Sequence, residues 1–297
     1  MITVILRGGL GNQMFQYATG IGIAKHNLTS LAIDAAYLND GSPRGNFTRR
    51  SYSLDIFAVK PRLTALSKIS EKAPVPALWL GMDFAAAFAG ELFGRKFFSE
   101  KKGHLFDEQV FNVGNTAVIW GFWQTEKYFI QAEDEVRAAF RFPAPGNEAI
   151  VRAKDEVSRV NAVALHVRRG DYLHPKYSKV YGGTDTSYYD AAIAHMAARV
   201  KSPTLFVFSD DIAWCKEHIK APFPVVFMAD ETAGSKASGH LELMSLCKHN
   251  IIANSSFSWW GAWLNENQGK IVVAPKKWEE GLAADAIDTI PAGWVTL

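Results

Sequence analysis

Residues 1–34 read MITVILRGGLGNQMFQYATGIGIAKHNLTSLAID, and this stretch decides the fold. The apolar run at residues 2–6 has the composition of a buried strand, and a glycine-rich turn follows it. Between residues 14 and 24, apolar side chains recur at steps of three and four, which is the period of a helix with one buried face. A second apolar run ends the stretch at residues 31–34. The pattern therefore predicts a β-α-β unit with parallel strands.

The second half of the chain shows the same alternation of strands and helices. Strands are expected at residues 160–167, 204–208, 224–228, 250–253 and 270–274. Helices are expected at residues 187–200, from 211, and at 240–247 and 256–265. Such alternation favours a parallel sheet covered on both faces. The first half adds a strand at 117–122 and a helix at 126–140, while residues 42–110 are assigned only loosely.

A proline-rich segment marks the expected boundary between two domains. The regular pattern stops at Phe142-Pro143-Ala144-Pro145-Gly146. A length of 297 residues also favours two domains over one or three. We therefore expect an α/β protein with Rossmann-type domains at residues 1–145 and 146–297, and a cleft between them that binds ligands.

Composition excludes several classes of protein. With 48% hydrophobic and 21% charged residues, the chain has the composition of a globular protein rather than a disordered or fibrous one. The 32 basic residues nearly balance the 30 acidic residues, so nucleic acid is not an expected partner. Two cysteines cannot staple a chain of this length, and they indicate buried thiols in a reducing compartment, which favours the cytoplasm.

No membrane-spanning segment is expected. The amino-terminal residues lack the features of a signal peptide. The longest nearly apolar run, residues 78–90, is shorter than the roughly 20 residues that cross a bilayer. Residues 60–102 mix basic side chains with phenylalanines, which would suit peripheral contact with an anionic membrane at its inner face. A solvated helix face is the favoured interpretation of that segment.

The first motif that carries chemistry is Gly8-Gly9-Leu10-Gly11-Asn12-Gln13, placed between the first strand and the first helix. Glycines there let backbone amides approach a ligand closely. The motif is not a P-loop, and Met14 stands where a dinucleotide fingerprint has its third glycine. The amides of Asn12 and Gln13 suit hydroxyls and phosphate oxygens, whereas a tight structural turn is the alternative.

The second motif, His166-Val167-Arg168-Arg169-Gly170-Asp171-Tyr172, lies at the carboxyl end of a predicted strand. Open α/β sheets bind their ligands at this edge. The planar fork of arginine pairs with phosphate through two hydrogen bonds, so Arg168 and Arg169 suit a diphosphate leaving group without a metal. An exposed basic loop is the alternative, and the preceding strand and the following Asp171 argue against it.

The third motif is Asn254-Ser255-Ser256-Phe257-Ser258-Trp259-Trp260, where a strand end turns into a helix. Ser255 or Ser256 can cap that helix. The same hydroxyls and the free amides of the first helical turn also suit a phosphate. Trp259 and Trp263 share one helix face and are expected to pack in the core rather than stack on a sugar.

The spacing of candidate metal ligands and nucleophiles argues against several other enzyme classes. No two aspartates lie two residues apart, so the Asp-x-Asp element that often holds a divalent cation on a sugar nucleotide is missing. The pairs Cys215 with His218 and Cys247 with His249 have non-standard spacing for zinc. No Gly-x-Ser-x-Gly elbow is present. We therefore expect no metal and no cofactor.

Several segments together resemble the signature blocks of the α-1,2-fucosyltransferases, glycosyltransferase family 11. The blocks are GGLGNQMFQYA, HVRRGDY and LMSLCKHNIIANSSFSWWGAWL, supported by GFWQTEKYF and SYYDAAI. They cover both halves of the chain, but residues 60–110 carry no usable resemblance. Members of the family often have an acidic residue before the Leu-x-Leu-Met-Ser segment, a candidate partner for guanine. Here that position is His240, with Glu242 two residues later.

The resemblance implies a GT-B-like fold and inverting transfer of L-fucose from GDP-fucose to the 2-hydroxyl of a terminal β-galactoside. The acceptor would be an oligosaccharide or glycolipid precursor, bound on the side of the first domain, with GDP-fucose on the second as co-substrate. The implied catalytic residues are Arg169 and Asp171, although Asp171 could equally hold the arginines in place. The implied donor-binding residues are Gly11, Asn12, Gln13, His166, Arg168, Arg169, Asn254, Ser255, Ser256 and Ser258.

Three alternatives stay open on sequence grounds. A non-catalytic protein that binds a GDP-sugar would keep the arginine and serine motifs. A fucosyltransferase that forms another linkage would keep them as well. A nicotinamide-dependent oxidoreductase shares the β-α organisation but requires the complete glycine fingerprint, which this chain lacks.

Overall fold

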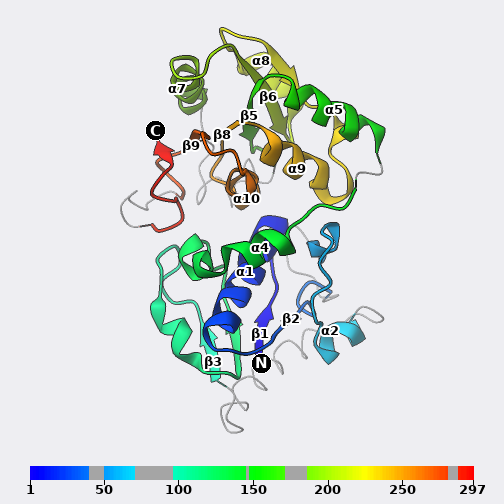
Figure 1. Ribbon diagram of the computed structural model, residues 1–297, viewed down its shortest axis with the longest axis vertical. Coiled ribbons are helices and arrows are strands. Elements are labelled where there is room, and N and C mark those ends of the chain that lie inside the picture. The colour runs from blue at the N-terminus through cyan, green and yellow to red at the C-terminus, as the bar shows by residue number, and fades with distance from the viewer. Residues whose placement is uncertain (40–49, 71–95, 145–146, 171–185, 280–286) are drawn as a thin grey trace. The chain divides into compact units, whose positions relative to one another are not determined.

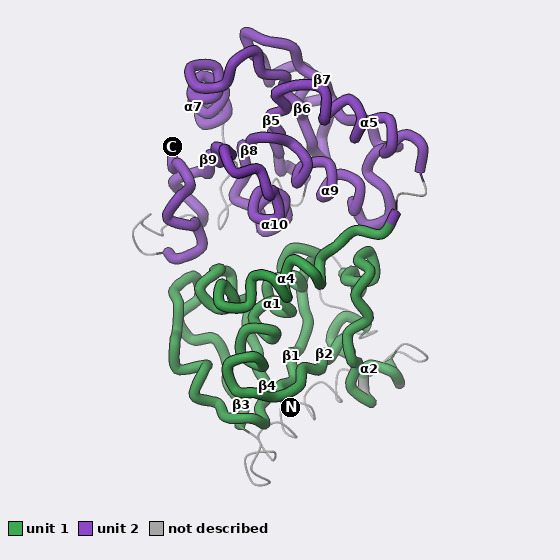
Figure 2. Tube along the Cα trace, viewed as in Figure 1, with its two compact units in different colours: residues 1–143 green, residues 144–297 purple. Residues whose placement is uncertain are grey.

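The computed structural model describes residues 1–39, 50–70, 96–144, 147–170, 186–279 and 287–297. Contacts within the chain separate it into two compact units, Met1–Pro143 and Ala144–Leu297 (Figure 2). The division falls in the proline-rich segment, two residues before the boundary expected from the sequence. Which unit takes which substrate stays a prediction.

Unit 1 is built on a four-stranded parallel sheet in the order β2-β1-β4-β3 (Figure 1). Its strands are β1 (Ile2–Ile5), β2 (Leu31–Asp34), β3 (Lys96–Ser99) and β4 (Ala117–Trp120). Helix α1 (Leu10–His26) joins β1 to β2 and packs against both strands. The predicted β-α-β unit is confirmed, and β3 lies in the region that the sequence left loosely assigned.

The described part of unit 1 also contains smaller elements, and one prediction there is wrong in part. They are η1 (Leu54–Ile56), α2 (Ala65–Ser70), η2 (Glu108–Val113), η3 (Glu126–Tyr128), η4 (Ile130–Ala132) and α4 (Glu133–Ala139). The continuous helix expected at residues 126–140 is two single turns followed by the short helix α4. Phe129 interrupts the path with a φ of −140°. Its ring is fully buried, so packing overrides local helix propensity.

Unit 2 contains a six-stranded parallel sheet in the order β10-β9-β8-β5-β6-β7. Its strands are β5 (Asn161–Val167), β6 (Pro203–Ser209), β7 (Val225–Phe227), β8 (His249–Ile251), β9 (Val272–Ala274) and β10 (Val295–Thr296). The five predicted strands are confirmed, whereas β10 was not predicted.

The helices of unit 2 also match the predicted alternation. They are α5 (Glu148–Ser158), α7 (Thr186–Ala197), α8 (Ile212–His218), α9 (Ser238–Leu246) and α10 (Ser256–Leu264), with single turns η6 (Asp230–Thr232) and η7 (Ser235–Ala237). Of these α-helices in the described part of unit 2, α5 alone was not predicted. The resulting α/β architecture is the predicted fold class.

Apolar side chains from the central strands and from α7 form a core in unit 2. Val163 and Leu165 of β5 pack with Ile193 of α7 in one buried cluster. The indoles of Trp259 and Trp263 stack at a centroid distance of 6.2 Å, and both are buried. These two tryptophans therefore lie in the core, as the sequence predicted.

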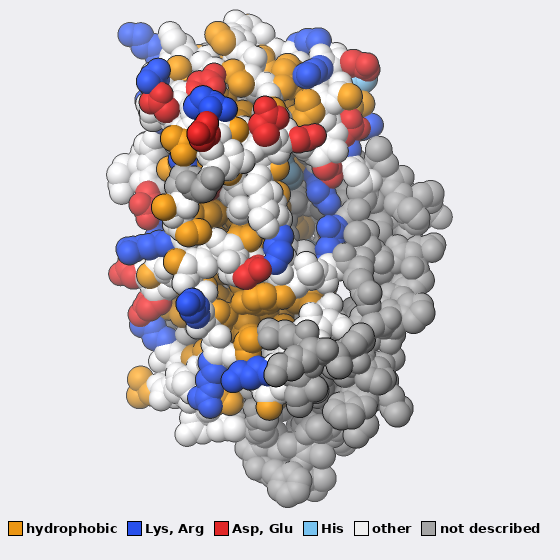
Figure 3. Space-filling view, turned by 90° about the vertical axis from the view of Figure 1, so that its right-hand side faces the viewer, with side chains coloured by type: hydrophobic (Ala, Val, Ile, Leu, Met, Phe, Trp, Pro, Cys, Tyr) orange, Lys and Arg blue, Asp and Glu red, His pale blue; other side chains and the backbone are white. Residues whose placement is uncertain are grey.

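The described residues contain no helix long and apolar enough to cross a membrane. The segment considered for membrane contact, residues 60–102, lies partly outside the described residues, which omit 71–95. On the face shown in Figure 3, acidic and basic side chains are interspersed over the described surface.

Candidate active site

Two neighbouring strands of unit 2 end at the same edge and carry charges of opposite sign. Strand β5 pairs in parallel with β6, with Val167 opposite Ser209. Arg168 and Arg169 follow β5, and Asp210 and Asp211 follow β6. Because parallel strands point the same way, their carboxyl ends bring these four side chains together.

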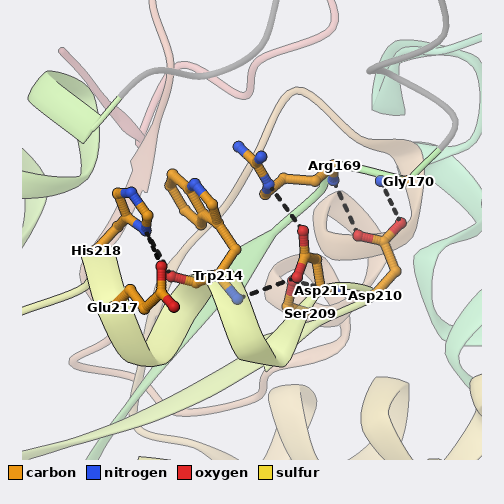
Figure 4. Close-up of polar contacts among 8 residues, drawn as sticks. All are labelled: Arg169, Gly170, Ser209, Asp210, Asp211, Trp214, Glu217 and His218. Atoms are coloured by element: carbon orange, nitrogen blue, oxygen red, sulfur yellow. Dashed lines mark hydrogen bonds and ion pairs between the residues drawn. The ribbon is translucent and has the colours of Figure 1, made fainter.

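Arg169 is held on two sides. Its Nε donates to Oδ2 of Asp211 at 3.1 Å, and its guanidinium carbon lies 4.0 Å from the ring centroid of Trp214. The other face of Trp214 stacks on His218 at 4.4 Å, so the indole lies between the side chains of Arg169 and His218 (Figure 4). The terminal nitrogens of Arg169 point away from Asp211. This arrangement fixes the guanidinium plane and leaves its fork directed outward.

The two aspartates do different jobs. Asp210 pairs with Arg168 at 2.8 Å and accepts the backbone N–H groups of Arg169 and Gly170. Asp211 caps α8 by accepting the N–H of Trp214 at 3.1 Å. That hydrogen bond, followed by the one from Arg169, lowers the pKa of Asp211. Asp210 therefore shapes the loop after β5, and Asp211 holds both Arg169 and the helix that carries Trp214.

His166 is buried at the end of β5 and uncharged at neutral pH. Burial, assisted by the positive charge of Arg168, lowers its pKa to about 3. Its Nδ1 is buried without a hydrogen-bond partner among the described residues. An orphaned buried ring nitrogen marks a position where a bound group can complete the hydrogen bonding. His166 can therefore supply a hydrogen bond to a ligand, but not a charge.

The amino end of α10 lies beside His166, because the rings of His166 and Phe257 are 5.6 Å apart. Ser255 is the N-cap residue, and its side chain makes no capping hydrogen bond. Ser256 begins the helix and is partly exposed. The amides and hydroxyls of this first turn can therefore accept an anion.

Two residues of the same motif have structural contacts instead. Ser258 is buried and its hydroxyl donates to the carbonyls of Ala253 and Ser255. The Asn254 side chain donates to the carbonyl of Trp278 at 3.1 Å. Ser258 and Asn254 therefore support this turn, and their assignment as donor-binding residues stays a prediction.

The glycine motif of unit 1 is placed differently from the prediction. Helix α1 begins at Leu10, so Gly11, Asn12 and Gln13 lie in its first turn rather than in a loop before it. Gln13 is fully buried and donates to the carbonyls of Gly8 and Ser51. Its oxygen accepts the N–H of Ser53 at 2.8 Å. Both ends of the Gln13 amide therefore make structural hydrogen bonds, and its assignment as a donor-binding residue stays a prediction.

Asn12 and a residue that the sequence analysis missed lie at the carboxyl edge of the unit 1 sheet. Asn12 is partly exposed and accepts a hydrogen bond from Gln124, which follows β4. Arg7 follows β1, and its guanidinium carbon lies 3.8 Å from the ring centroid of Phe122 and 4.6 Å from that of Trp120. The position of Arg7 directly after the apolar run at residues 2–6 was the sequence signal that could have identified it as a candidate site residue.

The remaining candidates have clear positions or lie outside the described residues. Asp171 lies outside them, and the arginines have Asp210 and Asp211 as their acidic partners. His240 is buried, with Nε2 3.1 Å from the hydroxyl of Thr232. Glu242 pairs with Lys154 at 2.5 Å.

The described residues contain no group of three or more His, Cys, Asp or Glu side chains that could hold a metal ion. Cys215 and Cys247 are buried free thiols, as predicted. Burial raises the pKa of Cys215 to about 11 and that of Cys247 further, so neither is a reactive thiolate. Metal independence itself stays a prediction.

Two parallel sheets, each with candidate ligand-binding groups at its carboxyl edge, give an α/β protein of GT-B-like fold. The fold matches that of a mutant of Arabidopsis thaliana FUT1 solved in complex with GDP, with a TM-score of 0.50 and 10% sequence identity. The match covers 91% of this chain and 69% of the other.

Sequence comparison gives the family. The family description "Glycosyl transferase family 11" matches residues 91–297. An alpha-1,2-colitosyltransferase of Escherichia coli is 32% identical over 302 residues, covering 100% of this chain and 99% of that protein. Galactoside alpha-(1,2)-fucosyltransferase 2 of Mus musculus is 38% identical over 105 residues, or 34% of this chain and 30% of that protein. The chain belongs to glycosyl transferase family 11.

Proposed function

We propose that this protein transfers L-fucose from GDP-fucose to the 2-hydroxyl of a terminal β-galactoside, with inversion and without a metal ion. Membership of glycosyl transferase family 11 supports a glycosyl transfer. The α-1,2 linkage is named for both relatives, and a galactoside acceptor for the mouse one. The acceptor would be a free oligosaccharide or a glycolipid precursor.

The observation that carries the proposal is the fixed guanidinium of Arg169. As the bond to fucose breaks, negative charge grows on the β-phosphate and the sugar becomes oxocarbenium-like. A planar fork held by Asp211 and Trp214 can receive that charge through two parallel hydrogen bonds. Because these contacts exist before substrate binds, little reorganisation is needed in the transition state.

Other groups at the same edge would complete the donor site. The first turn of α10 offers amide donors to phosphate oxygens, and neutral His166 offers a hydrogen bond. Inversion requires the acceptor hydroxyl to attack from the side opposite the diphosphate and to lose its proton. Asp171 remains a candidate for the proton acceptor, because it directly follows the arginine loop in sequence.

The test is transfer by the purified chain from GDP-fucose to lactose, with the product linkage resolved by NMR. We expect an α-1,2-linked fucosyl-lactose, with undiminished turnover in EDTA. Loss of activity in EDTA that Mn²⁺ or Mg²⁺ restores would overturn the role of the arginines in neutralising the phosphates. Release of GDP only when a galactoside is added would exclude a non-catalytic binding protein.

Colitose is a second candidate for the transferred sugar, because the E. coli relative that spans the whole chain is a colitosyltransferase. Colitose is fucose without its 3-hydroxyl. A site that hydrogen-bonds this hydroxyl would reject the analogue that lacks it by a large factor, whereas an apolar site would discriminate weakly. Competition between GDP-fucose and GDP-colitose, compared as kcat/KM with one acceptor, assigns the donor.

A further inference from the structure

An amide pair joins two elements at the carboxyl edge of the unit 1 sheet. Gln124, four residues after the end of β4, donates from Nε2 to Oδ1 of Asn12 at 2.8 Å. Asn12 lies in the first turn of α1, which follows β1. Strands β1 and β4 are neighbours, so the pair bridges the ends of two adjacent strands.

The turn that carries Gln124 is held rigidly. Both carboxylate oxygens of Glu100, which follows β3, accept backbone N–H groups of the turn, from Phe122 at 2.7 Å and Trp123 at 2.9 Å. Gln16 donates to the carbonyl of Gly121 at 3.0 Å. Trp123 is fully buried and has a φ of +57°, a conformation that such a residue keeps only when its surroundings enforce it.

The hydrogen bond from Gln124 sets the orientation of the Asn12 amide. Because Oδ1 accepts from Gln124, Nδ2 lies on the opposite side of the amide, over Gly8. A Cβ at Gly8 would be 2.6 Å from Nδ2, and Gly8 has a φ of +78°. Only glycine fits there without collision or strain. Nδ2 has no hydrogen-bond partner among the described residues, and Asn12 is partly exposed.

We propose that Gln124 is a positioning residue that locks the Asn12 amide so that its NH₂ group, rather than its oxygen, faces the substrate. This rests on the proposed function. The group that Asn12 receives is then an oxygen acceptor, either a phosphate or sugar oxygen of the donor or a hydroxyl of the galactoside. Glu100 acts one step further away, by holding the turn that carries Gln124.

The test inverts the amide without changing its size. In Gln124→Glu the carboxylate can only accept, so Asn12 must turn its NH₂ group inward and present its oxygen outward. Asn12→Asp presents an oxygen outward directly. We expect each variant to lose about tenfold or more in kcat/KM. Gln131→Glu, at an exposed glutamine of the same unit, adds the same charge and is the matched control.

The KM values for the two substrates identify which substrate supplies the oxygen that Asn12 contacts. If Asn12 contacts the donor, Gln124→Glu raises KM for GDP-fucose and weakens GDP-fucose binding measured by calorimetry. If it contacts the acceptor, KM for lactose rises and GDP-fucose binding is unchanged. If the hydrogen bond between Gln124 and Asn12 were purely structural, Gln124→Glu would lower the melting temperature. It would then change neither KM value selectively.

A double-mutant cycle separates action through Asn12 from action by another route. In an Asn12→Ala background there is no amide to orient, so Gln124→Glu should cost little more than Asn12→Ala alone. Losses that multiply in the double variant would overturn the proposal, as would Gln124→Glu activity equal to that of Gln131→Glu. Should Gln124→Glu fail to fold, Asn12→Asp carries the same test.

These experiments distinguish failure of the positioning role of Gln124 from failure of the proposed function. Absence of transfer by the wild-type chain from any GDP-sugar removes the proposed function. Binding of GDP and of lactose by the same variants then decides the positioning role. Transfer by the wild type with no effect of Gln124→Glu removes only the positioning role.

Discussion

The two sheets end in edges of similar design but different electrostatics. In unit 1, Arg7 follows β1 and lies against Trp120 and Phe122. In unit 2, Arg169 follows β5 and lies against Trp214. Nε of Arg169 donates to an aspartate, whereas Nε of Arg7 is buried and has no hydrogen-bond partner in the described part of the chain. Burial lowers the pKa of Arg7.

The carboxylate of Glu100, which interacts electrostatically with Arg7, is used differently from the carboxylates of Asp210 and Asp211. Both carboxylate oxygens of Glu100 accept backbone N–H groups, from Phe122 and Trp123, and so order the turn after β4. Asp210 and Asp211 pair directly with arginines. The unit 2 edge holds the guanidinium of Arg169 in one orientation, which supports the proposal that its fork binds a diphosphate. The unit 1 edge holds the amide pair of Asn12 and Gln124 beside aromatic rings, and its assignment to the acceptor sugar stays a prediction.

The largest expected effect comes from Arg169→Lys. Lysine keeps the charge but loses the planar fork, so two parallel hydrogen bonds become a single contact. Loss of such a transition-state donor costs about 3 to 4 kcal/mol, or about a hundred- to a thousandfold in kcat. GDP-fucose should still bind, and the melting temperature should stay near that of the wild type. Near-normal turnover, or a melting temperature low enough to explain the loss, would leave Arg169 as scaffold.

A smaller effect is expected from Glu100→Gln in unit 1. The Gln amide nitrogen would face one of the two backbone N–H groups that Glu100 accepts, leaving it unsatisfied. We expect the free energy of unfolding to fall by about 2 kcal/mol, measured by urea denaturation. The exposed Glu148→Gln is the control, since Glu148 forms an exposed surface pair with Arg152. Equal stability of the two variants would contradict the stabilisation of the turn by the two hydrogen bonds to Glu100.

The buried imidazole of His166 should make stability depend on pH. Its pKa is lowered from 6.5 to about 3 in the folded chain. The unfolded chain therefore takes up the proton first, and stability is lost as the pH falls from about 6.5 toward 3. The contribution is about 1.4 kcal/mol for each pH unit. His166→Phe should remove it, and parallel stability–pH slopes for the two proteins would contradict the prediction.

The smallest expected effect is that of Asp211→Asn. Asparagine caps a helix as well as aspartate does, so α8 should persist and the melting temperature should change little. The charge on Arg169 loses its counterion, and because the pair is partly exposed we expect kcat to fall only about fivefold. Asp155→Asn, which breaks an exposed pair with Arg159, should leave kcat unchanged. A loss of activity equal to that of Arg169→Lys would mean that Asp211 has a larger role.

Much of unit 2 could be predicted from the sequence because its strands are short apolar runs and its helices show a clear period. The arginine motif was placed correctly at the end of β5 for the same reason. Its partners Asp210 and Asp211 were missed because strand pairing brings together residues about forty positions apart. The periodicity of apolar residues along the sequence does not show which strands pair with each other.

Unit 1 was harder to predict because its contacts are set by tertiary packing. The Gln13 side chain looked like a ligand-binding amide, but its partners Ser51 and Ser53 come from a segment without periodicity. Glu100 follows β3, which has only four residues, and its role depends on the buried turn at Trp123. Burial and long-range hydrogen bonds decide these roles.

The most direct test of the account compares the affinities of GDP and GMP for the wild type and for Arg169→Lys by calorimetry. GDP carries the terminal phosphate whose charge develops in the transition state, and GMP lacks it. If the fork of Arg169 receives this phosphate, the wild type should prefer GDP, and the variant should lose about tenfold or more of that preference. An unchanged preference for GDP in Arg169→Lys would contradict the assignment of the unit 2 edge to the diphosphate.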